Sequence, residues 1–152
     1  MSALATGLYL LSIASLGVFA GANLTEAFVL VPYWRSLDAV DFYRWYAAND
    51  KRLLRFFTPV TAVAAVSTIA AAIAFSSTLA RGSWCVLAAA LLSAVCAAMF
   101  PLYFAGVNAA FSAASIPSDR LPAELARWAR WHHVRTAVAL AALGCDLVPI
   151  LS

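Results

Sequence analysis

Four long apolar stretches constrain the fold of this chain more than any other feature of its sequence. They cover about residues 3–31, 54–79, 84–111 and 131–150. Each is long enough to cross the hydrocarbon core of a bilayer as a helix, which takes about 20 residues. A segment surrounded by lipid must satisfy its backbone hydrogen bonds internally, so a helix is the expected structure. We therefore predict a single transmembrane domain over residues 1–152, an all-α integral membrane four-helix bundle.

The composition agrees with this class and argues against others. Hydrophobic residues make up 64% of the chain and charged residues 11%, whereas soluble domains carry about 25% charged residues. The net charge of +3 is small, and no lysine-rich run or aromatic-spaced basic patch occurs, so no nucleic-acid partner is expected. The lipid bilayer is the expected partner, and the sequence leaves a homo-oligomer open.

The first stretch is typical of an uncleaved helix rather than a signal peptide. It lacks a basic N-terminal region, and its apolar run continues beyond the cleavage-like Ala20-Gly-Ala22. We expect this helix to end near Pro32. Gly17 and Gly21 form a GxxxG pair, which permits close approach of another helix.

Between the first and second stretches, residues 33–56 show a different pattern. Charged residues recur at helical spacing on one side, and aromatic and aliphatic residues on the other. This pattern predicts a short amphipathic helix that lies at the membrane interface, with Ser36 as its N-cap, and leads into the second span.

Basic residues are distributed unevenly between the two sides of the predicted membrane. The first and third connections hold nine of them, and the second connection holds only Arg81. By the positive-inside rule, we expect a multi-pass protein with both long connections in the cytoplasm and both termini outside. The nine basic residues are Arg35, Arg44, Lys51, Arg52, Arg55, Arg120, Arg127, Arg130 and Arg135.

Polar residues of three predicted spans fall at a similar depth, in the cytoplasmic third of the membrane. They are Asn23 and Glu26 in the first span, Asn108 in the third, and His132 and Arg135 at the start of the fourth. Ionisable groups inside a membrane usually pair with one another, so we expect an ion pair between Glu26 and Arg135. Such a network marks a functional pocket or, alternatively, fastens the helices without binding a ligand.

The fourth stretch carries several notable residues on one helical face. They are Trp128, His132, Arg135, Ala139 and Asp146. The small side chain of Ala139 is expected to leave room beside His132 for a flat ligand. Asp146 lies about 20 Å further along at a rise of 1.5 Å per residue, and we expect it to be a polar end near the outer surface.

A metal centre is the minority alternative for these residues. Glu26 and His132 are suitable ligand types, but the neighbouring His133 points about 100° away on a helix. The sequence contains no HxxxH, ExxH or cysteine cluster, and no nucleotide-binding, GxSxG or CxxC motif. We therefore predict no metal and no organic cofactor, with a transition metal held by Glu26 and His132 as the alternative.

The motif W-x-x-W-H-x-x-R spans residues 128–135 and opens the fourth stretch, and Asn108 lies near the end of the third. With a glycine-rich end to the first span and a proline soon after it, this order resembles a family of small four-helix membrane proteins of unknown function that includes fungal anthrone oxygenases. The resemblance covers most of the chain and rests on short motifs. Glu26 has no match in it. The matching positions are Asn108, Trp128, His132 and Arg135.

The resemblance implies oxidation of a hydrophobic, phenolic, anthrone-like molecule by O₂ as co-substrate, without an organic cofactor. Histidine titrates near neutral pH, so His132 is the expected general base. Arg135 and Asn108 are expected to stabilise the resulting anion, with Glu26 beside them. The expected substrate-binding residues are Asn23, Trp128, Trp131 and Ala139.

A non-catalytic membrane protein is the alternative from a different class. It would be an accessory subunit, or a component that binds or transports small molecules. A transporter needs a polar path across the membrane, yet the predicted polar groups gather on one side and the chain has only four predicted spans.

Overall fold

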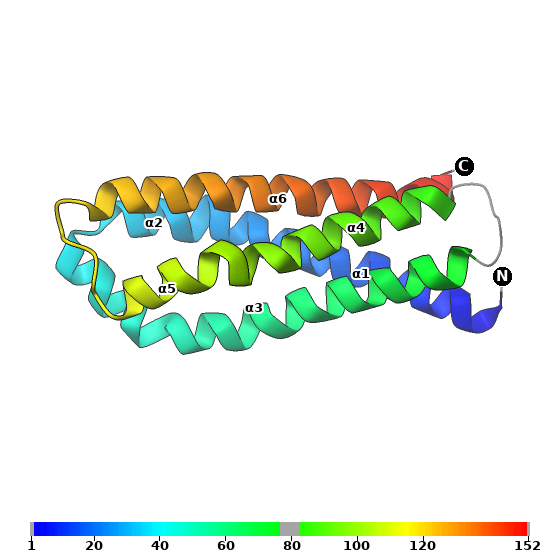
Figure 1. The fold of residues 1–152 in the computed structure, drawn as a ribbon, viewed down its shortest axis with the longest axis horizontal. Helices are drawn as coiled ribbons and strands as arrows, with labels where there is room; N and C mark the ends of the chain where they lie inside the picture. The colour runs from blue at the N-terminus through cyan, green and yellow to red at the C-terminus, as the bar shows by residue number, and fades with distance from the viewer. Residues whose placement is uncertain (1, 77–82, 152) are drawn as a thin grey trace.

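Four long helical runs pack side by side as an elongated antiparallel bundle (Figure 1). The computed structural model describes residues 2–76 and 83–151, without the side chains of the last residue in each range. The elements are α1 (Ala3–Thr25), η1 (Glu26–Leu30), α2 (Val31–Ser36), α3 (Ala39–Ser76), α4 (Ser83–Met99), η2 (Phe100–Phe104), α5 (Ala105–Ser112) and α6 (Leu121–Leu151). Around the bundle, α1 contacts α3, α3 contacts α4, α4 contacts α6, and α6 contacts α1. The predicted all-α four-helix bundle is confirmed, and each run is long and apolar enough to cross a membrane.

Two of the runs contain a π-helical turn next to a proline. In the first run, the N–H of Val31 bonds to the carbonyl of Glu26, and Pro32 lies in the first turn of α2. Proline has no N–H to donate, and Pro32 lies just after the π-helical turn, where the regular i→i−4 hydrogen bonding is already interrupted. The predicted helix end near Pro32 is therefore wrong, because the helical run continues to Ser36. Pro101 is placed in the same way at the start of η2.

The predicted interfacial helix is not a separate element, because residues 39–56 form the first half of α3. This segment contains no glycine or proline, so nothing in it interrupts the helix before the second apolar stretch. Its N-cap is Asp38, whose Oδ1 accepts a hydrogen bond of 2.9 Å from the N–H of Asp41. The hydroxyl of Ser36, the predicted cap, instead donates to the carbonyl of Tyr33 within α2.

An aromatic cluster fills the bundle at the end that carries the α2–α3 and α5–α6 connections. It consists of Trp34, Phe42, Tyr46, Phe111 and Trp128, all at most 3% exposed. Ring centroids lie 5.2 Å apart for Phe42 and Phe111 and 5.4 Å apart for Trp34 and Trp128, in edge-to-face orientations. Further along the bundle, smaller side chains form a middle cluster of Leu16, Phe19, Ala20, Ala64, Cys96, Ala139 and Ala142.

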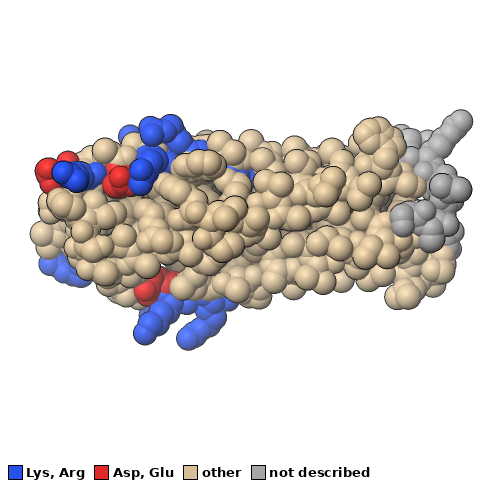
Figure 2. Space-filling model, viewed as in Figure 1, with Lys and Arg blue, Asp and Glu red and all other residues tan. Residues whose placement is uncertain are grey.

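The exposed charged residues gather at the same end as the two long connections (Figure 2). Every lysine and arginine that the structure describes falls within residues 35–55 or 120–135. Along the rest of the bundle, large apolar side chains face outward, and Val66 and Leu91 are 67% and 62% exposed. Such a surface is unfavourable in water and suits contact with lipid or another protein.

Asp146, which was expected to be a polar end near the outer surface, is buried between the helices of the bundle. Its side chain is fully buried, and Ser12 Oγ donates to its Oδ2 at 2.6 Å. The hydroxyl of Tyr9 donates to its backbone carbonyl. Asp146 follows His132 by nearly four helical turns, so both residues share the inward face of α6.

The GxxxG pair of α1 faces away from the other helices. A Cβ atom built at Gly17 or Gly21 meets nothing within 4 Å. The close helix approach that this pair permits is therefore not made by any part of the chain that the structure describes.

Candidate functional site

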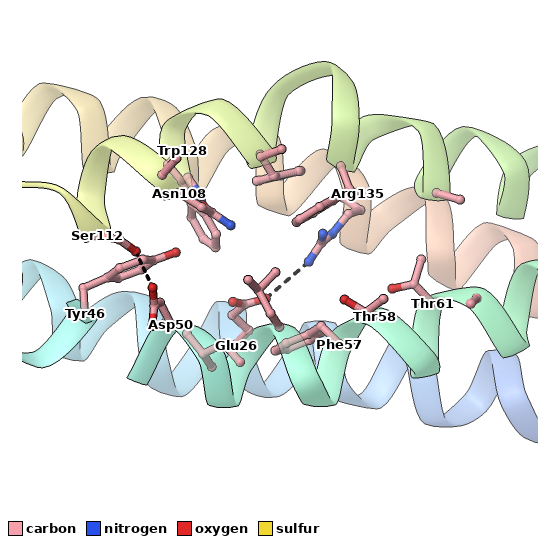
Figure 3. Close-up of a pocket in the computed structure, with 18 of the residues that line it drawn as sticks. Glu26, Tyr46, Asp50, Phe57, Thr58, Thr61, Asn108, Ser112, Trp128 and Arg135 are labelled. Carbon is pink, nitrogen blue, oxygen red and sulfur yellow. Dashed lines mark hydrogen bonds and ion pairs between the residues drawn. The ribbon is translucent and has the colours of Figure 1, made fainter. Parts of the chain in front are cut away.

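A cavity of about 830 Å³ lies in the half of the bundle that carries the charged end. Residues 46–62 of α3 contribute one wall, and residues 97–113 of the third run and its C-terminal end contribute the opposite wall. Glu26, Trp128 and Arg135 close the side formed by the first and last runs (Figure 3). A mainly apolar cavity with a few polar groups is the usual character of a site for a small organic molecule.

Four buried polar side chains connect the first run to α6 beside this cavity. These residues, Asn23, Glu26, His132 and Arg135, form the polar cluster, and none is more than 6% exposed. The guanidinium of Arg135 donates from Nε to Asn23 Oδ1 at 2.9 Å and from Nη2 to Glu26 Oε2 at 3.3 Å. Its central carbon lies 4.6 Å from the ring centroid of Phe104, a cation–π contact. The ion pair expected between Glu26 and Arg135 is present.

His132 is fully buried behind Trp128 and is not among the described residues that line the cavity. The two rings stack, with 5.0 Å between centroids and 13° between planes. Nε2 lies 3.0 Å from the backbone carbonyl of Asn23, which can only accept, so we place the ring proton on Nε2. Nδ1 is then an acceptor and faces Nη2 of Arg135 at 3.4 Å. Both ring nitrogens are therefore engaged within the protein.

The sequence assembles the polar cluster from two pairs of residues that lie about one helical turn apart. Asn23 and Glu26 occupy the inner face of the first run, and His132 and Arg135 occupy the inner face of α6. The pairs meet because α1 and η1 both pack against α6. Glu26 begins the π-helical turn η1, an irregularity that occurs frequently at functional sites.

Four of the predicted site residues line the cavity: Glu26, Asn108, Trp128 and Arg135. The indole N–H of Trp128 donates to Asn108 Oδ1 at 2.9 Å, and the amide nitrogen of Asn108 points into the cavity (Figure 3). Asn23, by contrast, is fully buried behind this wall, and its amide donates to a carbonyl one turn earlier on α1. Asn23 therefore holds Arg135 and is not among the described residues that line the cavity.

Two further residues predicted to bind substrate, like Asn23, do not line the cavity within the described chain. Trp131 is 44% exposed and packs against Tyr103, with 5.3 Å between ring centroids. Ala139 is fully buried in the middle cluster, so the room expected beside His132 is filled by neighbouring helices. His133 is exposed, as its turn away from His132 on the helix predicts.

The sequence interpretation missed the polar residues that α3 and α5 contribute to the cavity. Asp50 Oδ2 accepts a hydrogen bond of 2.9 Å from Ser112 Oγ, which joins the two helices. Tyr46, Asp50, Thr58 and Thr61 all lie on the cavity face of α3. These residues lie on one helical face only if α3 is a single continuous helix. The sequence interpretation placed a separate helix before the second span, so it did not identify this common face.

The polar cluster does not have the composition of a metal site. Among residues 2–76 and 83–151, no group of three or more His, Cys, Asp or Glu side chains is placed to hold a metal ion. Glu26 and His132 do approach each other, with 3.6 Å between Oε2 and Nδ1. However, Nη2 of Arg135 lies within 3.4 Å of both atoms, so the guanidinium supplies the positive charge there.

Comparison with protein-family models, with curated proteins and with solved structures gives no match for this chain. The class that the structure defines is a four-helix bundle with a mainly apolar cavity and a buried ion pair in the cavity wall. A functional assignment therefore depends on the chemistry that this cavity supports.

Proposed function

We propose that this protein is a membrane-embedded oxidoreductase that oxidises a hydrophobic aromatic molecule, similar to an anthrone, with O₂. The observation that carries the proposal is the position of the Glu26–Arg135 ion pair in the wall of a mainly apolar cavity. Removal of a proton from carbon requires a base close to the C–H bond and positive charge close to the anion that forms. Glu26 is such a base and Arg135 carries such a positive charge, and both side chains line the same cavity.

The membrane setting is part of the proposal. Each of the four helical runs is long and apolar enough to cross a bilayer, and the exposed basic residues gather at the end with the long connections. By the positive-inside rule, this end lies in the cytoplasm and both termini lie outside. The bilayer then concentrates a hydrophobic substrate around the protein.

The proposed reaction converts a CH₂ group between two aromatic rings into a ketone. The carboxylate of Glu26 accepts a proton from this carbon, while Arg135 and the amide of Asn108 stabilise the enolate oxygen. The electron-rich anion then reduces O₂, and the peroxide formed at the carbon loses water. One oxygen atom of O₂ stays in the ketone, and the other leaves as water with the two hydrogens of the CH₂ group.

His132 has a positioning role in this proposal instead of the general-base role expected from the sequence. Its ring lies behind Trp128, its Nε2 donates to the carbonyl of Asn23, and its Nδ1 faces Arg135. A general base must come within hydrogen-bond reach of the proton that it removes. Glu26 lines the cavity and meets this requirement better than His132.

The resemblance to the anthrone-oxygenase family supports the same chemistry. Of the four positions that carry it, Asn108, Trp128 and Arg135 line the cavity, and His132 contacts two of these three residues. Glu26 is outside the resemblance, and its role rests on the geometry of the cavity.

A non-catalytic membrane protein that binds a small molecule is the second candidate. One observation favours it. Among the described residues, some buried side-chain atoms lack a hydrogen-bond partner, but none of these atoms belongs to the polar cluster. Such a satisfied network also serves to fasten helices in a membrane. In that case the cavity still binds a hydrophobic ligand but leaves it unchanged.

Oxygen uptake distinguishes the two candidates. The purified protein is reconstituted in lipid nanodiscs and supplied with anthrones that differ in their hydroxyl groups, with empty nanodiscs as the control for spontaneous oxidation. The oxidoreductase is expected to consume one O₂ for each quinone formed, and ¹⁸O₂ is expected to place one labelled oxygen in the quinone. Uptake equal to that of empty nanodiscs across the panel would favour the non-catalytic candidate.

A further inference from the structure

The cavity is closed toward both ends of the bundle. On the charged side, the aromatic cluster fills the space between the helices, and its members are at most 3% exposed. On the other side, the buried members of the middle cluster come from α1, α3, α4 and α6 and are at most 2% exposed. A ligand that moved along the bundle axis would have to displace one of these close-packed clusters.

The cavity is open on one side, along the seam between α3 and the third helical run. Leu54, Thr58 and Ala62 line the cavity and are also exposed on the surface of α3. Ala109 on α5 and Ala113 at its C-terminal end also line the cavity and are exposed. Residues that both line a cavity and reach the surface mark its mouth, and this mouth is lined mainly by apolar and small side chains.

A hydrogen bond limits the mouth on the side of the charged end. Ser112 Oγ donates to Asp50 Oδ2 and joins α5 to α3. Lys51 and Arg52 directly follow Asp50 in the sequence and are exposed, so this edge of the mouth coincides with the charged level of the bundle. The cavity wall continues from Asp50 to Thr61, about 16 Å along the helix at 1.5 Å per residue. The mouth therefore extends from the charged level into the apolar part of the bundle.

We propose that the cavity is filled sideways, by a hydrophobic small molecule that leaves the bilayer and passes between α3 and α5. The inference rests on the membrane setting of the proposed function and is independent of the oxidation. The small side chains of Ala62 and Ala109 leave the passage open for a flat ring system. At the back of the cavity, Glu26 and Arg135 then meet a polar group of the ligand.

A probe that is confined to the bilayer tests this route. The probe is a phospholipid with 9,10-anthraquinone attached to one acyl chain, incorporated in proteoliposomes. It cannot undergo the proposed oxidation, because its reacting carbon is already a ketone. Binding is followed by quenching of Trp128, which lines the cavity, measured as the difference between the protein and its Trp128→Phe variant.

Substitutions at the rim of the mouth give the expected and the contradicting results. We expect saturable quenching of Trp128, and we expect Ala109→Phe to slow its onset by about tenfold or more, because the larger side chain obstructs the passage. Ala98→Phe is the matched control, since Ala98 is exposed on α4 and lies outside the mouth. Ala62→Phe tests the opposite rim against Val63→Phe.

The outcomes separate the route from the chemistry. Absence of saturable quenching, or equal rates for Ala109→Phe and Ala98→Phe, would overturn the sideways route. If the rim variants slow the saturable quenching and the protein shows no oxygen uptake, the route is supported and the oxidation is refuted. Oxygen uptake by the wild-type protein, together with quenching that begins equally fast in each rim variant and its control, would support the oxidation and overturn the route.

Discussion

Nη2 of Arg135 lies 3.3 Å from Oε2 of Glu26, although the two residues are 109 positions apart in the sequence. The contact joins α6 to the π-helical turn of the first run, and neither residue is more than 6% exposed. Both side chains also line the cavity. The same ion pair therefore links two helices and presents a base and a cation to a ligand.

Removal of one partner of this pair is expected to destabilise the protein more than removal of both. Glu26→Gln or Arg135→Gln leaves a buried charge without its partner, and breaking a buried pair typically costs about 3–5 kcal/mol. The double variant carries neither charge, so its free energy of unfolding is expected to exceed that of either single variant. Unfolding of the four proteins in detergent measures the difference.

The exposed pair between Arg44 and Asp41 is the control for that comparison. Its Nη1–Oδ1 distance of 2.7 Å is shorter than the buried contact, yet both side chains are more than half exposed. An exposed pair of this kind contributes about 1 kcal/mol or less, so the same set of variants there is expected to have a small effect. Additive losses at Glu26 and Arg135 would show that the buried pair does not interact.

The two histidines are expected to differ in their effect on stability. His132→Ala leaves a void against Trp128 and removes the hydrogen bond to Asn23, so we expect the free energy of unfolding to fall by about 2–5 kcal/mol. His133 is exposed, and His133→Ala is expected to change stability by about 0.5 kcal/mol or less. Denaturant unfolding in detergent checks both values.

A conservative variant distinguishes positioning from proton removal by His132. His132→Gln keeps an N–H donor at the position of the ring, so it is expected to recover part of both the stability and the turnover lost in His132→Ala. The positioning role is wrong if His132→Ala keeps its full stability and yet loses turnover. That result would restore His132 as the general base.

The main features of the fold were predictable from the sequence because hydrophobic length alone determines them. Four apolar stretches gave four helices, and the connections between them gave an antiparallel bundle. The helix ends were not predictable in the same way. Pro32 looks like a helix end in the sequence, but the π-helical turn next to it lets the run continue. Local hydrogen bonding of this kind leaves no signal in hydrophobicity.

Some residues of the site could be predicted from their depth in the predicted spans, whereas the position of others depends on how the helices pack. Glu26, Asn108 and Arg135 were found because polar residues at one depth of a membrane tend to meet. The spacing of residues on α6 predicts that Trp128 and His132 lie on the same helical face. It does not predict which of the two reaches the cavity, so it could not show that Trp128 covers His132. Asp50 was missed because its role depends on α3 being continuous.

The orientation of the bundle is expected to follow its charges. Reporter fusions after Ser118, in the connection between α5 and α6, are expected to show cytoplasmic exposure, and fusions to the C-terminus are expected to show exterior exposure. The measurement is the paired activity of a periplasmic and a cytoplasmic reporter at each site. Cytoplasmic activity of the C-terminal fusion would contradict the orientation.

Metal removal is expected to leave the reaction intact. Nη2 of Arg135 lies within 3.4 Å of both Glu26 Oε2 and His132 Nδ1, the two atoms that would otherwise bind a transition metal. The purified protein is expected to contain iron, copper and zinc well below one equivalent, and turnover is expected to persist after chelation. One equivalent of a metal, lost together with turnover in Glu26→Gln, would show that the cluster is a metal site.

The most direct test of the proposed reaction is turnover of the Glu26→Gln variant with an anthrone substrate under saturating O₂. Gln has nearly the shape of Glu but cannot accept the proton, so we predict that kcat falls by about 10²–10⁴ fold, the usual contribution of a general base. Asp119→Asn makes the same chemical change at an exposed residue of the α5–α6 connection, and we predict wild-type turnover for it. Equal turnover in Glu26→Gln and Asp119→Asn would contradict the account.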